Sequence, residues 1–183
     1  VTVKVKKEAC PNNLAPTSST TVTLALGDAI AVALLKARGF SSEDFAKSHP
    51  GGKLGKKLTL SVKDLMTKIE MAAVVKESDS IKELIFEVSS KKQGLALVKK
   101  KEKIVGVFSD GDLRRQLQKN ININEVKISE VMTRKFKTIS SAKLAVEAAE
   151  KMNKHKIYSL VVEENKDIVG VIAMHDILEA NVL

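Results

Sequence analysis

The sequence of 183 residues contains no tryptophan, and aromatic side chains make up only 3% of it. Hydrophobic residues nevertheless account for 44%, which is enough to fill the core of one sizeable domain or of two small ones. Because aromatic side chains are scarce, such a core must be built from valine, isoleucine, leucine and alanine. This composition favours helices packed on sheets, and it offers few rings on which the bases of a nucleic acid could stack.

Cysteine is almost absent as well, because Cys10 is the only one in the sequence. A single cysteine excludes an internal disulfide and agrees with a reducing compartment. No continuous apolar run approaches the ~20 residues that span a bilayer, and the first residues do not resemble a signal peptide. We therefore expect a cytoplasmic chain without a membrane partner. Since the sequence lacks an initial methionine and opens inside an apparent strand at residues 1–5, we also expect it to be a piece of a longer protein.

Acidic side chains are outnumbered, with 22 Asp and Glu against 31 Lys and Arg, which gives a formal net charge of +9. The excess divides as +5 for residues 1–60 (9 basic, 4 acidic), +3 for 61–118 (12 and 9) and +1 for 119–183 (10 and 9). No basic arm results. The densest cluster, Lys99–Lys101, lies between two strand-like runs, where a solvated hairpin turn is expected. A recognition helix is also missing, so we expect no nucleic-acid partner.

One strand-to-helix stretch occurs twice and organises the sequence. Residues 104–113 read IVGVFSDGDL, and residues 168–177 read IVGVIAMHDI. In each copy a β-branched run predicts a buried strand, a glycine interrupts it, and an aspartate six residues later stands where a helix begins. The repeat extends backwards, because DLMT at 64–67 returns as EVMT at 130–133. The sequence therefore contains two copies of one structural unit.

Both copies predict the same order of elements. In the first, Ser80 and Glu83 form a capping box at the start of an amphipathic helix. The further elements expected in the two copies are strands at 95–98 and 105–109 and a helix at 111–118, then a helix at 141–154, strands at 158–163 and 168–172, and a helix at 175–181. Each unit would bury only one face of its sheet. We therefore expect an α/β fold in which two βαββα-type units pack through their sheets.

The first 60 residues lie outside the repeat. Residues 22–38 predict a helix that is apolar on most sides and must therefore be buried. A short second helix is expected to start at Ser42–Asp44 and to end before Gly52. The glycines and lysines of residues 51–57 predict a flexible, solvated linker. These patterns divide the chain into an N-terminal segment (1–50), a linker (51–60) and two repeat units (61–119 and 120–183).

Ser109 and Asp112 are the sharpest candidates for ligand binding. A hydroxyl at a strand end and the amides of a helix start suit a phosphate, while a carboxylate accepts hydrogen bonds from ribose hydroxyls. The same two residues could instead cap their own helix and close a turn. Arg114 and Arg115 follow in the first turn and fit either a phosphate or a solvated helix face.

Both units resemble CBS motifs, which pair into a compact module that commonly binds adenine nucleotides. Gly106, Ser109 and Asp112 match the Gly-x-x-Ser/Thr-x-x-Asp pattern of CBS nucleotide sites. The resemblance implies an adenine nucleotide or a sugar nucleotide as the ligand. The second copy keeps Asp176 as a candidate ligand-binding residue but has Ala173 in place of the hydroxyl, so a phosphate there would lose one donor.

A second resemblance rests on residues 1–60. The motifs NLAPTSSTT at 13–21, GDA at 27–29, ALL at 33–35 and SHPGG at 48–52 together resemble the end of the sugar isomerase (SIS) domain of bacterial arabinose 5-phosphate isomerases. In that family the SIS domain is followed by two CBS motifs, which is the order found here. The family interconverts ribulose 5-phosphate and arabinose 5-phosphate, in the synthesis of the eight-carbon acid sugar (KDO) of lipopolysaccharide or capsule.

The isomerase resemblance implies that His49 is a catalytic residue. Aldose–ketose isomerisation opens a ring and moves a proton between adjacent carbons, and an imidazole that titrates near neutrality suits either step. A histidine before Pro-Gly-Gly could also simply end a helix. The hydroxyl cluster at residues 17–21 suits a sugar phosphate or, equally, a helix cap. The main phosphate loop and the acidic catalytic groups would lie upstream of Val1, so we expect this chain alone to be inactive.

The expected partners follow from these resemblances. They are a sugar phosphate for the parent enzyme, a nucleotide at the CBS pair, and other copies of the chain in a homo-oligomer. No cofactor is implied, and because His155 and His175 converge with no third ligand in the sequence, no metal site is expected. The alternative is a free-standing CBS protein that senses adenine nucleotides or a sugar nucleotide without catalysis.

Overall fold

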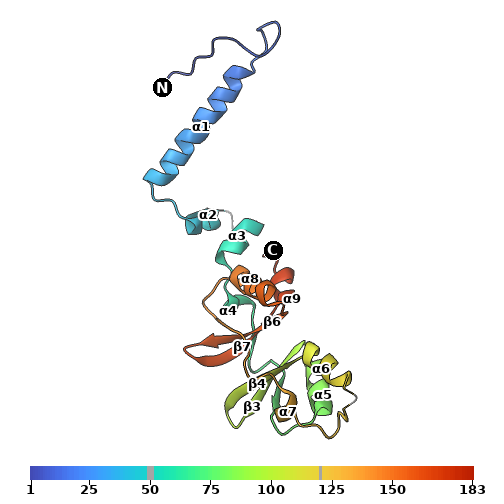
Figure 1. The fold of residues 1–183 in the computed structure, drawn as a ribbon. Helices are drawn as coiled ribbons and strands as arrows, with labels where there is room; N and C mark the ends of the chain where they lie inside the picture. The colour runs from blue at the N-terminus through green and yellow to red at the C-terminus, as the bar shows by residue number, and fades with distance from the viewer. Residues whose placement is uncertain (49–51, 120) are drawn as a thin grey trace. The chain divides into compact units, whose positions relative to one another are not determined.

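The computed structural model describes residues 1–48, 52–119 and 121–183, and the chain divides into two compact units between Ser48 and residue 49. The N-terminal unit contains α1 (Ser18–Ala37) and α2 (Ser42–Ser48), and the C-terminal unit contains both repeats (Figure 1). Residues 1–5 pair with no strand in the described part of the chain, so the strand expected there is wrong. The alternation of valines does not form a strand without a neighbouring strand to bond to.

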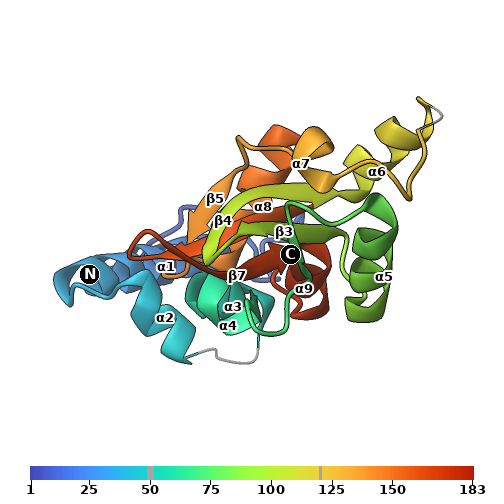
Figure 2. The same cartoon turned by 90° about the horizontal axis from the view of Figure 1, so that it is seen from below.

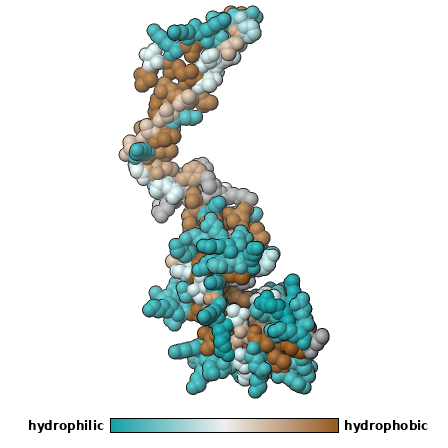
Figure 3. Space-filling model, viewed as in Figure 1, coloured by the Kyte–Doolittle hydropathy of each residue, from teal (hydrophilic) through white to brown (hydrophobic). Residues whose placement is uncertain are grey.

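Helix α1 has no buried residue, although the sequence predicted a buried helix. Apolar side chains such as Leu24 (68% exposed) and Val32 (63%) face outward, and a band of hydrophobic surface follows the helix in Figure 3. The prediction is wrong for this chain because the N-terminal unit provides no second layer to cover α1. By length and composition alone the helix could cross a membrane, contrary to the expectation from the sequence, but a core helix of a soluble domain passes the same test.

The segment predicted to be a flexible linker is largely helical. Helix α3 (Lys53–Thr59) covers most of it, and Lys56 donates a hydrogen bond from Nζ to the carbonyl oxygen of Ala180 at 3.1 Å. Lysine and leucine are good helix formers, and Gly55 is buried. The segment is therefore held against the end of the second repeat, which corrects the expected loop over 52–57.

The C-terminal unit contains two sheets, one for each repeat. The first has the order β2 (Val74–Lys76), β3 (Leu95–Lys100), β4 (Lys103–Ser109), with helices α5 (Ile81–Lys91) and α6 (Asp110–Leu117). The second has the order β1 (Thr67–Lys68), β7 (Asp167–Ala173), β6 (Ser159–Glu164), β5 (Thr138–Ser140), with helices α8 (Ala145–His155) and α9 (Met174–Glu179). Short helices α4 (Val62–Leu65) and α7 (Ile128–Val131) precede β1 and β5. The predicted α/β fold of two related units is confirmed.

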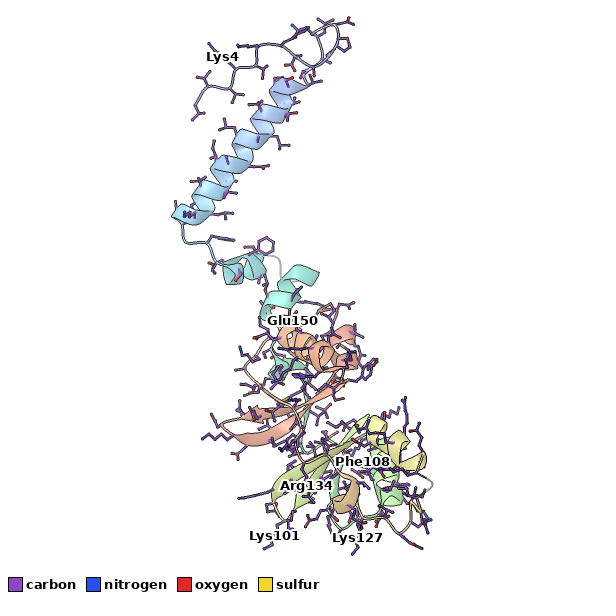
Figure 4. The ribbon with its side chains drawn as sticks, viewed as in Figure 1. Lys4, Lys101, Phe108, Lys127, Arg134 and Glu150 are labelled. Carbon is purple, nitrogen blue, oxygen red and sulfur yellow. The ribbon has the colours of Figure 1, made fainter. Side chains whose placement is uncertain are left out.

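The two hairpins have the same register. Leu95 lies opposite Ser109 in the first, and Ser159 lies opposite Ala173 in the second, so equivalent residues are 64 positions apart. Both hairpins turn through two residues, and Lys101 occupies the solvated turn of the first, as the sequence predicted (Figure 4).

The residues that begin each repeat, here called its leading segment (around Thr67 in the first and Thr133 in the second), pair with a strand of the other repeat. Thr67, at the start of the first repeat, pairs with Val171 in β7, and Thr133, at the start of the second, pairs with Val107 in β4. The glycine in each repeated stretch permits this approach. A Cβ on Gly170 would overlap the backbone carbonyl of Thr67. Neither repeat is therefore complete without the other.

The core of the C-terminal unit has a helix–sheet part in each repeat and a third part between the sheets. Phe108 (1% exposed) anchors the first repeat between β4 and its helices (Figure 4). Between the sheets, Leu97 and Val107 of the first repeat pack with Val161 and Val171 of the second, so that β3 and β4 lie beside β7 in Figure 2. The predicted sheet-to-sheet packing is confirmed, and it creates the cleft described next.

Candidate functional site

A cleft of about 560 Å³ opens between the two repeats. One wall includes the end of β4 and the start of α6, with Ser109 and Asp112. The other consists of residues 133, 135–137, 155–159 and 161 of the second repeat. Its ionisable lining comprises Asp110, Asp112, Arg114, Arg115, Lys135, Lys137, His155 and Lys156. Tyr158, the one tyrosine of the sequence, adds an exposed aromatic ring to the same wall.

Ser109 and Asp112 are held together at the start of α6. One carboxylate oxygen of Asp112 accepts hydrogen bonds from the Ser109 amide at 2.8 Å and from its hydroxyl at 2.7 Å. The other oxygen accepts from the guanidinium of Arg115 and from the Thr133 hydroxyl at 3.3 Å. The helix-capping role considered from the sequence is thus present, and both residues also line the cleft.

Asp112 is only 6% exposed but remains favourable as a carboxylate. Burial is the largest single influence and by itself raises the pKa of Asp112, yet the hydrogen bonds from Ser109 and Arg115 outweigh it. The pKa of Asp112 is therefore below its ordinary value. The cleft keeps a fixed negative acceptor next to several cations at neutral pH.

The equivalent carboxylate of the second repeat is less well stabilised. Asp176 accepts a hydrogen bond from the Ala173 amide at 2.8 Å, and alanine supplies no hydroxyl. Burial raises the pKa of Asp176 above its ordinary value, because the Ala173 amide and the neighbouring His175 compensate only in part. Asp176 thus lacks the hydroxyl hydrogen bond that Asp112 accepts from Ser109, and the pKa values of the two aspartates are shifted in opposite directions.

The residues predicted for isomerase chemistry lie in the N-terminal part of the chain. His49 lies outside the described residues. At the start of α1, the carboxylate of Glu8 accepts hydrogen bonds from the Thr17 amide at 2.7 Å, the Thr17 hydroxyl at 3.0 Å and the Ser19 amide at 3.2 Å. Hydrogen bonds from Ser19 and Thr17 lower the pKa of Glu8 to about 2. The hydroxyl-rich segment at residues 17–21 thus binds an anion, which in this structure is the carboxylate of Glu8.

The sequence did not identify the contribution of the second repeat to the cleft. Lys135, Lys137, Lys156 and Tyr158 belong to no motif, and they face Asp112 only because Thr133 pairs with β4 of the other repeat. The spacing of the two repeats does not indicate that the segment around Thr133 pairs with β4 of the first repeat, which is the pairing that brings these side chains to the cleft. Among residues 1–48, 52–119 and 121–183, no group of three or more His, Cys, Asp or Glu side chains could hold a metal ion.

Comparisons with known proteins agree with this architecture. The CBS domain family model matches residues 62–119 and 128–182. Among curated proteins, the arabinose 5-phosphate isomerase KdsD of Francisella tularensis is 50% identical over 96% of this chain, and that of Pseudomonas aeruginosa is 49% identical over 98%. The match covers 54% and 56% of those proteins, in their C-terminal part, so the chain spans about half the length of the curated relatives it matches.

A solved structure provides a further comparison. The crystal structure of CBSX2 in complex with AMP matches 66% of this chain and 95% of that chain, with a TM-score of 0.55 and 26% sequence identity. The two family-model matches together cover more than half of the sequence. This chain therefore belongs to the CBS domain family, and over nearly its whole length it is similar to the C-terminal part of the arabinose 5-phosphate isomerases.

Proposed function

We propose that this chain is the C-terminal portion of an arabinose 5-phosphate isomerase, in which the CBS pair binds a nucleotide and regulates the enzyme. One observation carries the proposal: the similarity to these isomerases extends over 176 residues, whereas the CBS matches lie within 62–182. The similarity must therefore include most of the N-terminal unit. A free-standing CBS sensor, the alternative, would have no use for such a segment.

His49 is the residue that we assign to catalysis. Isomerisation passes through an enediol, and a histidine can accept or return the proton because its pKa lies near neutrality. The remaining catalytic and phosphate-binding groups belong, in this proposal, to the half of the relatives' length that this chain does not span. The chain alone is accordingly inactive, since one acid–base group without a positioned sugar phosphate cannot complete the reaction.

The N-terminal unit supports the same assignment. Apolar side chains of α1 that are exposed here need a cover, and we propose that the rest of the isomerase domain, within a cytoplasmic homo-oligomer, provides it. The amides at Thr17 and Ser19 already bind a carboxylate, so they are suited to a sugar phosphate that replaces Glu8.

The CBS pair supplies the nucleotide site. We assign the ribose hydroxyls to Asp112, which is buried and ionised, and a phosphate to Ser109 and the start of α6. The Gly-x-x-Ser-x-x-Asp pattern, the cleft and the AMP bound by CBSX2 support an adenine nucleotide, and a sugar nucleotide would use the same ribose and phosphate contacts. Asp176 holds the corresponding position in the second repeat.

The test of the catalytic assignment uses the complete protein. His49→Ala should lower kcat for the conversion of ribulose 5-phosphate by roughly the 10²–10⁴-fold that is typical of lost acid–base catalysis. His175→Ala, which removes an exposed histidine from α9, is the matched control and should leave kcat unchanged. Full activity of the His49→Ala enzyme, or turnover by the 183-residue chain alone, would contradict the assignment.

A further inference from the structure

The two repeats make a strict comparison of their ligand positions possible. Equivalent residues are 66 positions apart at Thr67 and Thr133, in the leading segments that the repeats exchange, and 64 apart from Val74 and Thr138 onwards. The counterparts of Asp110, Asp112, Arg114, Arg115, Lys137 and Lys156 are Met174, Asp176, Leu178, Glu179, Ala73 and Lys92. Lys135 lies in the stretch where the first repeat is two residues longer, and the corresponding residues 69–73 contain no lysine or arginine.

The two positions differ in charge. The cleft at Asp112 is lined by five Lys and Arg residues and two aspartates, which gives +3. The corresponding position at Asp176 has Lys92 and the His155 counterpart Lys91, against Asp176 and Glu179, which gives 0. The difference comes chiefly from Arg114, Arg115 and Lys137, whose counterparts are Leu178, Glu179 and Ala73.

The cations of the first position are not neutralised by the chain. Arg115 is paired with Asp112. Within the described ranges, by contrast, no ion pair joins Lys135, Lys137 or Lys156 to a carboxylate. These three lysines are exposed and come from the second repeat. Like charges gathered at one cleft repel each other, and a bound dianion would relieve that repulsion.

We propose that the two ligand positions have separate roles, and that only the cleft at Asp112 accepts a nucleotide phosphate. Lys135, Lys137 and Lys156 form its anion subsite. This inference rests on the proposed nucleotide site and adds that the second repeat supplies cations for the phosphate. The ribose lies on the first repeat at Asp112, and the phosphate lies between Ser109 and the lysines of the second repeat, so the ligand joins the two repeats.

The position at Asp176 is unsuited to a phosphate for two independent reasons. Ala173 offers no hydroxyl donor, and Glu179 would repel an anion. Leu178 and Ala73 replace the cations Arg114 and Lys137 of the first position. The structure therefore predicts one phosphate-bearing nucleotide per chain.

The experiment is calorimetric titration of the 183-residue chain with AMP and, separately, with adenosine. AMP should bind with a stoichiometry of one and at least about fivefold more tightly than adenosine, because two or more exposed charge pairs add to the ribose contacts. Lys135→Met with Lys137→Met should remove most of this preference and leave adenosine affinity unchanged. Lys82→Met with Lys103→Met removes the same charge from exposed positions outside the cleft lining and should retain the preference.

The possible outcomes distinguish a failure of the anion subsite from a failure of the nucleotide site itself. If neither AMP nor adenosine binds, the assignment of the CBS pair as a nucleotide site fails. If both bind equally to the unaltered chain, or if the control pair loses the preference as fully as the cleft pair, the anion subsite is wrong while the nucleotide site stands. Two equivalent AMP molecules per chain would overturn the division of roles between the two positions.

Discussion

Replacing Gly170 by alanine tests the exchange of leading segments between the repeats. An added methyl group would overlap the backbone carbonyl of Thr67, and backbone cannot move aside as a flexible side chain can. Overpacking of this kind costs about 1–3 kcal/mol. If β1 leaves β7, the chain also loses neighbouring contacts such as the 2.9 Å hydrogen bond from the Ile69 amide to the Val169 carbonyl, worth about 0.5–1.5 kcal/mol.

The expected consequence is a lower thermal midpoint. A total cost of roughly 1–4 kcal/mol corresponds to a fall in Tm of roughly 3–15 °C for a unit of this size, measured by circular dichroism on the 183-residue chain. Gly111→Ala is the matched control, because its methyl group would meet Arg115 and Ser109 at an ordinary 3.6 Å inside α6. There alanine should stabilise the helix by roughly 0.5–1 kcal/mol. A Tm for Gly170→Ala equal to that of the unaltered chain would refute the reasoning.

Two further predictions concern the paired aspartates. Asp112→Asn should weaken AMP binding about ten- to a hundredfold, because a charge-assisted hydrogen bond to ribose is lost, and calorimetry measures this directly. The same substitution should lower the free energy of unfolding at neutral pH, because the pKa of Asp112 is lower in the folded chain than in the unfolded chain. The stability that Asp112 contributes is complete above the unfolded pKa of about 3.9 and is lost as the pH falls through the folded pKa. Asp176→Asn should act in the opposite direction, raising Tm at pH 7 but not near pH 3, since burial raises that pKa and the ionised form is the costly one. A Tm difference that does not change with pH for either variant would contradict these assignments.

The secondary structure of the repeats could be predicted because local signals agreed with tertiary packing. The capping box at Ser80 gave α5, and the repeated glycine-interrupted runs gave β4 and β7. The two-residue strand β1 was missed because a pairing so short leaves no periodicity, and its partner is about a hundred residues away. Helix α3 was missed because its glycine suggested a linker, whereas Gly55 is a buried residue within the helix.

The candidate site divides in a similar way. Ser109 and Asp112 could be identified because a carboxylate, a hydroxyl and a helix start occur at fixed spacing in one short stretch. Lys135 and Lys137 could not, because a lysine has no local signature and faces the cleft only through a long-range pairing. The predicted burial of α1 failed for a different reason. An apolar pattern indicates that a helix packs against other residues. It does not indicate whether those residues belong to the same segment of the chain.

The reciprocal pairing of Thr67 with β7 and Thr133 with β4 has an evolutionary consequence. The same contacts would form between two separate copies of a single repeat related by a two-fold axis, and such a dimer would carry two identical ligand positions. Once both copies are encoded in one chain, a substitution on one side is no longer duplicated on the other. In a single chain, Ala173, Leu178 and Glu179 can therefore differ from Ser109, Arg114 and Arg115 without loss of the first position.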